Sequence, residues 1–171
     1  MWYVVYTKNN YEKKTEVFFK KNNIDCYCPM NRIISEDMKD KKHLLYEPLF
    51  KSYVFVFLSD NQLAIIKECN SIINFVYYLG RPVTVNEFEI QNIKHFTMTY
   101  FNIRLEKTLV RLNRISRIVN RVSDYYGYDN KNENHNEHKI SIVISSLGYI
   151  LKAEYNITIT NEFKQSKLMN S

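Results

Sequence analysis

The segment from residue 53 to residue 58 is apolar at every position. Because side chains alternate across a strand, its residues divide between two faces: Tyr53, Phe55 and Phe57 on one, and Val54, Val56 and Leu58 on the other. A strand with one wet face carries polar residues at every second position. The pattern therefore predicts either a strand covered by two layers of protein or a strand with one face kept apolar for a partner.

The hydrophobic pattern of the first hundred residues predicts strands and helices in alternation. Aromatic and β-branched residues predict strands at 2–7, 24–29, 53–58, 72–78 and 83–85. Helical spacing predicts helices at 11–21, 61–68 and 87–101. The expected N-caps are Asn9 or Asn10 for the first helix and Asp60 for the second. The charged segment 31–46 is expected to form an exposed loop or a protruding hairpin, and residues 80–82 a turn.

The chain changes character after residue 103. The apolar residues of 105–126 follow a helical spacing but also suit the strands of a small barrel, so both interpretations stay open. Asparagine-rich residues 128–138 predict a polar loop or linker. Alternation across 140–157 predicts a β-hairpin with one buried face. We therefore expect domains at 1–103 and 104–160, followed by a polar tail at 161–171.

Composition bears on where the protein works. The 171 residues suffice for one large domain or two small ones. No segment approaches the roughly 20 apolar residues that span a membrane, and the first residues lack the pattern of a secretory signal. Three cysteines are an odd number, unsuited to a disulfide framework. We therefore expect a cytoplasmic protein without a membrane contact.

The net charge of +6 is concentrated in one part of the chain. Residues 104–126 carry six basic and two acidic side chains. A stripe of this strength permits contact with nucleic acid but does not require it. One function consistent with the sequence is therefore a general nucleic-acid-binding module that uses the basic stripe at 104–121.

Residues that carry catalytic or metal chemistry are sparse. Cys26 and Cys28 would need two further ligands to hold zinc, and the candidates His135 and His138 lie in the asparagine-rich segment. The sequence contains no glycine-rich phosphate loop and no nucleophile motif. We therefore expect no catalytic residues, no metal and no cofactor.

The first half of the chain contains a series of short motifs: WYVVYTK at 2–8, CYCPM at 26–30, EPLF at 47–50, YVFV at 53–56, INFV at 73–76, GRPV at 80–83 and the helix at 87–93. In this order they resemble the motifs of NusG-type transcription elongation factors. Each piece is weak by itself, but their order through residues 2–95 makes the resemblance specific. The chain is most similar to the specialised RfaH-like and UpxY-like members of the family.

The resemblance implies an α+β protein: an N-terminal NusG-type sandwich of an antiparallel sheet with flanking helices, and a small C-terminal KOW-like β-barrel, degenerate or partly helical. It also implies a monomer that binds the clamp helices of RNA polymerase and promotes elongation or antitermination at particular operons. Polymerase contacts fall on Tyr53 and Phe55, with Phe50 and Tyr6 nearby. The alternative interpretation of these four aromatic residues is that they are core.

Further partners also follow from the resemblance. The non-template DNA strand is expected at Lys8, Tyr11 and Lys14, where lysine neutralises phosphate and tyrosine stacks on an unpaired base. An ordinary solvated helix face is the alternative. The C-terminal domain is expected to contact a ribosomal protein or termination factor Rho. In some specialised relatives this region is instead stored as helices that cover the polymerase-binding face.

The sequence departs from the family pattern at two places. Lys51-Ser52 stands where the family segment has Pro-Gly, which removes a turn-forming pair. The glycine-rich turn that marks a KOW barrel is not found, and only residues 140–157 resemble the closing strands of that barrel. The first departure affects the position of Phe50 at the surface, and the second affects which partners the C-terminal half contacts.

Overall fold

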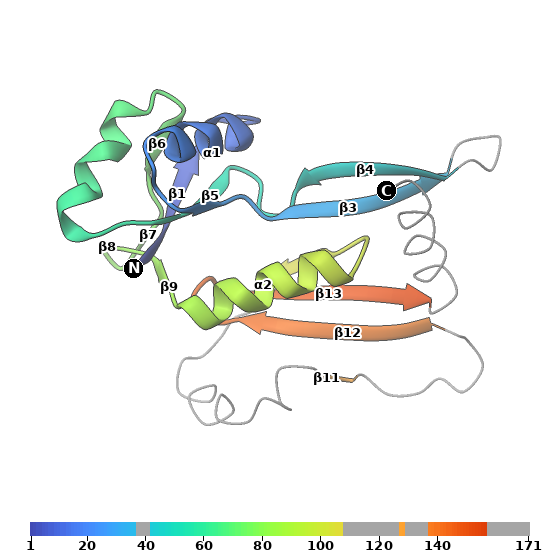
Figure 1. Ribbon diagram of the computed structural model, residues 1–171. Coiled ribbons are helices and arrows are strands. Elements are labelled where there is room, and N and C mark those ends of the chain that lie inside the picture. The colour runs from blue at the N-terminus through green and yellow to red at the C-terminus, as the bar shows by residue number, and fades with distance from the viewer. Residues whose placement is uncertain (37–41, 108–126, 129–136, 157–171) are drawn as a thin grey trace. The chain divides into compact units, whose positions relative to one another are not determined.

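The computed structural model describes residues 1–36, 42–107, 127–128 and 137–156 (Figure 1). The chain divides into two compact units. The first comprises residues 1–31 and 45–98, and the second comprises residues 32–44 together with the described residues from 99 onward. The boundaries of 1–103 and 104–160 expected from the sequence stay a prediction.

The first unit is built on an antiparallel sheet of five strands. These are β1 (Trp2–Thr7), β2 (Cys26–Tyr27), β5 (Tyr53–Phe57), β6 (Ile72–Phe75) and β9 (Thr84–Val85). Four of them run in the order β2-β5-β1-β6, and β9 also pairs with β1. The mixed α/β architecture with an antiparallel sheet agrees with the fold class expected from the sequence. The predicted strand at 72–78 is divided into β6 and the short β7.

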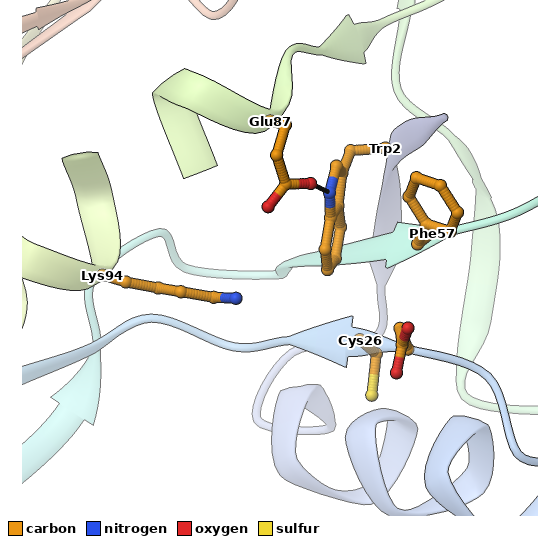
Figure 2. A pocket seen from close by; sticks show the side chains of 6 residues that line it. Trp2, Cys26, Phe57, Glu87 and Lys94 are labelled. Atoms are coloured by element: carbon orange, nitrogen blue, oxygen red, sulfur yellow. Dashed lines mark hydrogen bonds between the residues drawn. The ribbon is translucent and has the colours of Figure 1, made fainter. Parts of the chain in front are cut away.

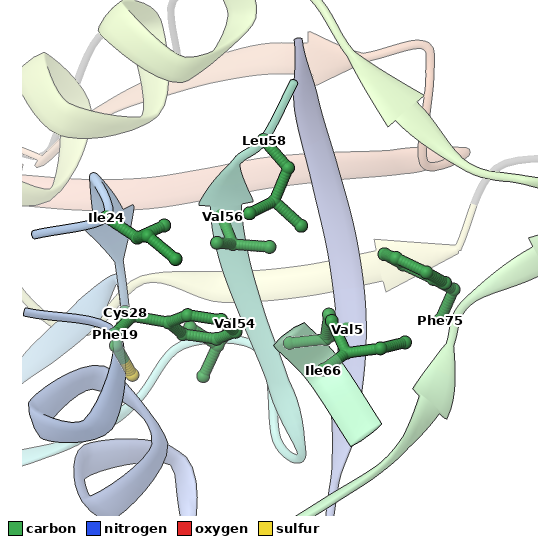
Figure 3. Packing of buried hydrophobic residues seen from close by; sticks show 9 residues of the cluster. All are labelled: Val5, Phe19, Ile24, Cys28, Val54, Val56, Leu58, Ile66 and Phe75. Atoms are coloured by element: carbon green, nitrogen blue, oxygen red, sulfur yellow. The ribbon is translucent and has the colours of Figure 1, made fainter. Parts of the chain in front are cut away.

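The doubly apolar strand β5 lies in the interior of this sheet, beside β1. Val54 and Val56 point into a core with α1 (Glu12–Lys21) and the 3₁₀ helix η1 (Asp60–Glu68) (Figure 3). The buried members of this core are Val5, Phe19, Ile24, Cys28, Val54, Val56, Leu58, Ile66 and Phe75. The inward face of the strand is thus the one predicted from its alternation.

Helix boundaries follow the predicted segments, but the predicted caps are wrong. The N-cap of α1 is Tyr11, because Asn10 takes a left-handed φ of 63° outside the helix. The N-cap of η1 is Ser59, and its backbone N–H donates to Gln62 Oε1 at 3.1 Å. This bond from the N-cap backbone to the side chain three residues later belongs to a capping box. The third helix, α2 (Glu87–Thr99), ends two residues before the predicted limit.

Two hairpins complete the first hundred residues. β3 (Met30–Glu36) pairs with β4 (Lys42–Pro48), which confirms the hairpin alternative for the charged segment. β7 (Tyr77–Tyr78) pairs with β8 (Arg81–Pro82). The turn between β7 and β8 requires positive φ at Leu79 (48°) and Gly80 (76°). Glycine adopts this conformation without a steric penalty. The turn expected at 80–82 lies one residue earlier, at 79–80, because Arg81 and Pro82 pair with β7 as strand β8.

The second unit contains a sheet in the order β10-β13-β12-β11. Its strands are β10 (Arg104–Lys107), β11 (Gly127–Tyr128), β12 (Glu137–Ile144) and β13 (Tyr149–Asn156). The β12–β13 hairpin confirms the predicted one, with Ile142 opposite Leu151 and both side chains buried. The start of the ambiguous segment 105–126 is strand in β10. Residues 108–126, 129–136 and the predicted tail lie outside the described residues.

Within the second unit, β3 is bonded to the residues that follow α2. The Asn102 N–H donates to the Arg32 carbonyl at 2.8 Å, and the Ile34 N–H donates to Asn102 Oδ1 at 2.9 Å. The Arg32 guanidinium lies 4.1 Å from the centroid of the Phe101 ring, a cation–π contact. The connection leading into β10 is therefore held against the hairpin.

No helix among the described residues is both long and apolar enough to cross a membrane.

Candidate protein-binding face and cavity

The second face of the first sheet carries aromatic side chains from two neighbouring strands. The register places Trp2 opposite Phe57, Val4 opposite Phe55, and Tyr6 opposite Tyr53. These six residues form what we call the aromatic face. Helix α2 contacts it, because Glu87 Oε2 accepts a hydrogen bond from Trp2 Nε1. The Thr97 hydroxyl of the same helix bonds the hydroxyl of Tyr27 on β2 at 2.9 Å.

Exposure varies along the aromatic face, and this separates core from surface. Val4 and Phe55 are fully buried in its middle. Tyr6 is 43% exposed at one end and Phe57 is 44% exposed at the other. Tyr53 is half-buried, with its ring centroid 6.0 Å from that of Tyr6 in an edge-on arrangement. The solvent-facing parts of this face are therefore its two ends.

The structure brings together the four predicted polymerase-binding residues but gives them different environments. Phe50 is buried, and its ring meets that of Phe55 edge-on at 5.5 Å between centroids. As exposed anchors, Phe50 and Phe55 do not fit this structure, because both are packed as core. Tyr6 and Tyr53 form the part that a partner can reach. Whether any of the four contacts polymerase stays a prediction.

The predicted DNA-binding residues lie together at the start of α1. The Tyr11 N–H donates to the Lys8 carbonyl at 3.1 Å. The Lys14 ammonium lies 5.1 Å from the centroid of the Tyr11 ring, within cation–π range. All three side chains are exposed. The arrangement combines two cations with one available ring face, and its contact with DNA stays a prediction.

A buried carboxylate supports the turn before β5 where the family's Pro-Gly is missing. Ser52 has a left-handed φ of 63°, and its N–H donates to Glu12 Oε1 at 2.7 Å. Glu12 is only 3% exposed, although it lies in the first turn of α1. This role could not be predicted from the sequence, because the two residues are forty positions apart. The carboxylate compensates for a turn that lacks glycine.

A cavity at the Trp2–Phe57 end of the aromatic face also escaped the sequence analysis (Figure 2). It is lined by Trp2, Asp25, Cys26, Phe57, Glu87 and Lys94. The hydrogen bond from Trp2 Nε1 to Glu87 Oε2 is 2.5 Å long. Together with a bond from Gln91, it holds the pKa of the Glu87 carboxyl below its ordinary value. The side of the cavity formed by Glu87 is therefore anionic at neutral pH.

Cys26, which lines this cavity, is a partly buried thiol, and Cys28 is a buried one. Burial raises the pKa of Cys26 to about 11 and that of Cys28 to about 12. The Cys26 thiol points to α1, where it donates to the Glu16 carbonyl at 3.4 Å. Within the described residues, no group of three or more His, Cys, Asp or Glu side chains is arranged to hold a metal ion. His135, one of the two histidines considered for zinc, lies outside them.

Comparison with known proteins identifies the family. The model of the family described as "Transcription termination factor nusG" matches residues 1–94, more than half of the chain. The chain belongs to the NusG family of transcription factors, a class whose members are generally not enzymes.

The other comparisons add little to this assignment. The solved structure titled "Domain interaction in Thermotoga maritima NusG" matches with 16% sequence identity, a TM-score of 0.43, and coverage of 91% of this chain and 96% of that chain. The family assignment rests on the sequence match over residues 1–94. No curated protein matches the chain.

Proposed function

We propose that this protein is a transcription elongation and antitermination factor of the specialised RfaH-like or UpxY-like type, which binds RNA polymerase and promotes processive transcription of particular operons. Family membership supports a role in transcription. The observation that carries the polymerase contact is the Tyr6–Tyr53 pair, two tyrosines in edge-on contact that reach the surface from neighbouring strands. We place the factor in the cytoplasm as a monomer.

Tyr6 and Tyr53 are suited to receive a helix of a partner. A helix that lies on a surface is held by a few aromatic or aliphatic anchors, and tyrosine is enriched among the residues that dominate such interfaces. Both side chains sit on paired strands of an antiparallel sheet, and Phe55, two residues after Tyr53, is buried against Phe50. A rigid base lowers the entropic cost of ordering the anchors when the clamp helices of polymerase bind.

The exposed Lys8, Tyr11 and Lys14 would hold the non-template DNA strand of the elongation complex. Lysine ammonium groups neutralise phosphates, and the Tyr11 ring offers a stacking surface to an unpaired base. The Lys14 ammonium keeps close to this ring and so places positive charge next to the stacked base.

The C-terminal residues 104–160 would form a KOW-like domain that contacts a ribosomal protein or Rho. The described part contributes a sheet with a buried row of aliphatic side chains, among them Ile140, Ile142 and Leu151. A small barrel needs such an interior-facing row.

A pull-down with purified core RNA polymerase tests the function. We expect the full-length protein to be retained by polymerase at a salt concentration that removes it from free DNA and RNA. Binding to free nucleic acid that falls steeply with salt, together with no affinity for polymerase, would support the nucleic-acid-binding module instead.

A further inference from the structure

The cavity at the Trp2–Phe57 end of the aromatic face is separate from the proposed polymerase contact. Its volume is about 330 Å³, which accommodates one long side chain. Its two aromatic residues form one end of the β1–β5 register, whereas Tyr6 and Tyr53 form the other. The proposed contacts with polymerase and DNA use none of its six lining residues.

Of the two aromatic residues that line the cavity, Trp2 is buried and Phe57 is exposed to solvent. Trp2 and Phe57 meet edge-on with centroids 5.5 Å apart and an angle of 64° between their planes. Trp2 is only 6% exposed, whereas Phe57, which also lines the cavity, is 44% exposed. A phenylalanine ring that remains open to solvent beside a buried tryptophan offers a stacking surface for a ligand.

The polar side chains of the cavity give it an excess of negative charge. Asp25 is exposed, and its carboxylate makes no hydrogen bond or ion pair in the described part of the chain. Glu87 is held by Trp2 and Gln91 and stays ionised. Lys94 contributes the single positive charge, and the Cys26 thiol stays neutral at physiological pH because its pKa is raised. The lining therefore carries two carboxylates against one ammonium.

Lys94 shows that the Trp2 wall of the cavity accepts a cation. Its ammonium lies 5.5 Å from the centroid of the Trp2 ring and 5.5 Å from that of the Tyr27 ring. It forms no ion pair with a carboxylate among the described residues, even though Glu87 lines the same cavity. The cation is thus held by ring faces, while Asp25 and the open face of Phe57 remain available.

We propose that this cavity binds the guanidinium group of an arginine presented by a partner polypeptide. The planar group would stack on Phe57 while it donates hydrogen bonds to the Asp25 carboxylate, with Glu87 adding a favourable field. Arginine suits the site better than lysine, because a guanidinium stacks on rings, is weakly hydrated and bonds a carboxylate with two parallel donors. The alternative ligand is a carboxylate of the partner that pairs with Lys94, and titration with a glutamate amide distinguishes it from arginine.

Trp2 makes the test direct, because it is the only tryptophan of the chain and it lines the cavity. The full-length protein labelled with ¹⁵N gives a single indole N–H signal in its NMR spectrum. We would follow this signal and the tryptophan fluorescence while titrating N-acetyl-arginine amide, and repeat the titration with the lysine and glutamate amides. The expected result is a saturable shift with the arginine amide that is clearly larger than with the lysine amide.

Asp25→Asn provides the matched variant, since the side chain is exposed and its shape is kept. We expect at least a fivefold weaker affinity for the arginine amide in this variant. Asp60→Asn, which removes an exposed carboxylate from η1, should leave the affinity unchanged. No saturable shift with the arginine amide, an equal affinity in Asp25→Asn, or a saturable shift with the glutamate amide in its place would each overturn the proposal.

Discussion

Glu12 and Ser52 are joined by a hydrogen bond from the serine N–H to the buried carboxylate, with 2.7 Å between nitrogen and Oε1. The bond ties the first turn of α1 to the turn that leads into β5. Ser52 needs this support because its φ of 63° is unfavourable for a residue with a Cβ atom. This turn also determines where β5 begins at Tyr53. It therefore determines the position of the exposed Tyr6–Tyr53 end of the aromatic face.

Replacing Glu12 by alanine should lower the free energy of unfolding by about 1–3 kcal/mol, because the Ser52 N–H loses a charged acceptor in a partly buried place. Urea denaturation measures the change. Glu16→Ala serves as the control, since Glu16 makes a surface ion pair with Lys20. Such pairs contribute about 0–1 kcal/mol. Equal losses in the two variants would contradict the role given to Glu12.

Replacing Ser52 by glycine should raise the free energy of unfolding by about 0.5–1 kcal/mol. A left-handed φ costs a non-glycine residue roughly 1–2 kcal/mol. Glycine avoids this cost, but the greater conformational entropy of its unfolded chain offsets part of the resulting gain in stability. Ser52→Ala keeps the strain and should change stability little. A glycine variant less stable than the alanine variant would contradict the backbone strain assigned to Ser52, because both variants lack the serine hydroxyl and differ only in the Cβ atom.

Alanine substitutions on the aromatic face should differ in their cost to stability, although the residues lie on the same pair of strands, β1 and β5. Phe55→Ala should cost about 3–5 kcal/mol in unfolding free energy, the range for a buried aromatic residue. Tyr6→Ala should cost less than about 1 kcal/mol, because its ring is 43% exposed. Thermal and urea unfolding of the two variants checks this order. Similar costs would mean that the two side chains are equally buried in solution.

The hydrogen bond between Trp2 and Glu87 should be lost in acid. Its carboxyl pKa is lowered below the ordinary 4.5, first by the hydrogen bond from Trp2, so the bond stabilises the fold fully above that value. As pH falls through the lowered pKa, the carboxyl is protonated and this contribution is lost. The Trp2 indole N–H signal should therefore titrate with a midpoint below pH 4.5. Glu87→Gln should abolish this step, and a midpoint above pH 4.5 would contradict the assignment.

Much of the first unit could be predicted from the sequence. Aromatic and β-branched runs predicted β1 and β5, and the alternation in β5 separated Val54 and Val56 from the aromatic side chains. Periodicity reports which face of a strand a residue occupies, but not what covers that face. It therefore could not show that Phe55 is core while Tyr6 remains at the surface.

The missed features all depend on residues that are distant in sequence. Trp2 and Glu87 are 85 positions apart, and Glu12 and Ser52 are 40 apart. No local pattern brings such pairs together, because their meeting follows from strand pairing and from the position of α2. The caps were missed for a different reason. Several adjacent residues could serve as an N-cap, and only the backbone conformation selects Tyr11 and Ser59.

The affinity of the full-length protein for core RNA polymerase tests the central proposal most directly. It should be measured for the wild type, for Tyr6→Ala combined with Tyr53→Ala, and for Tyr78→Ala, which removes an exposed tyrosine from β7. The proposal predicts at least a tenfold loss in the double variant and none in Tyr78→Ala. Wild-type affinity in a folded double variant would contradict the account.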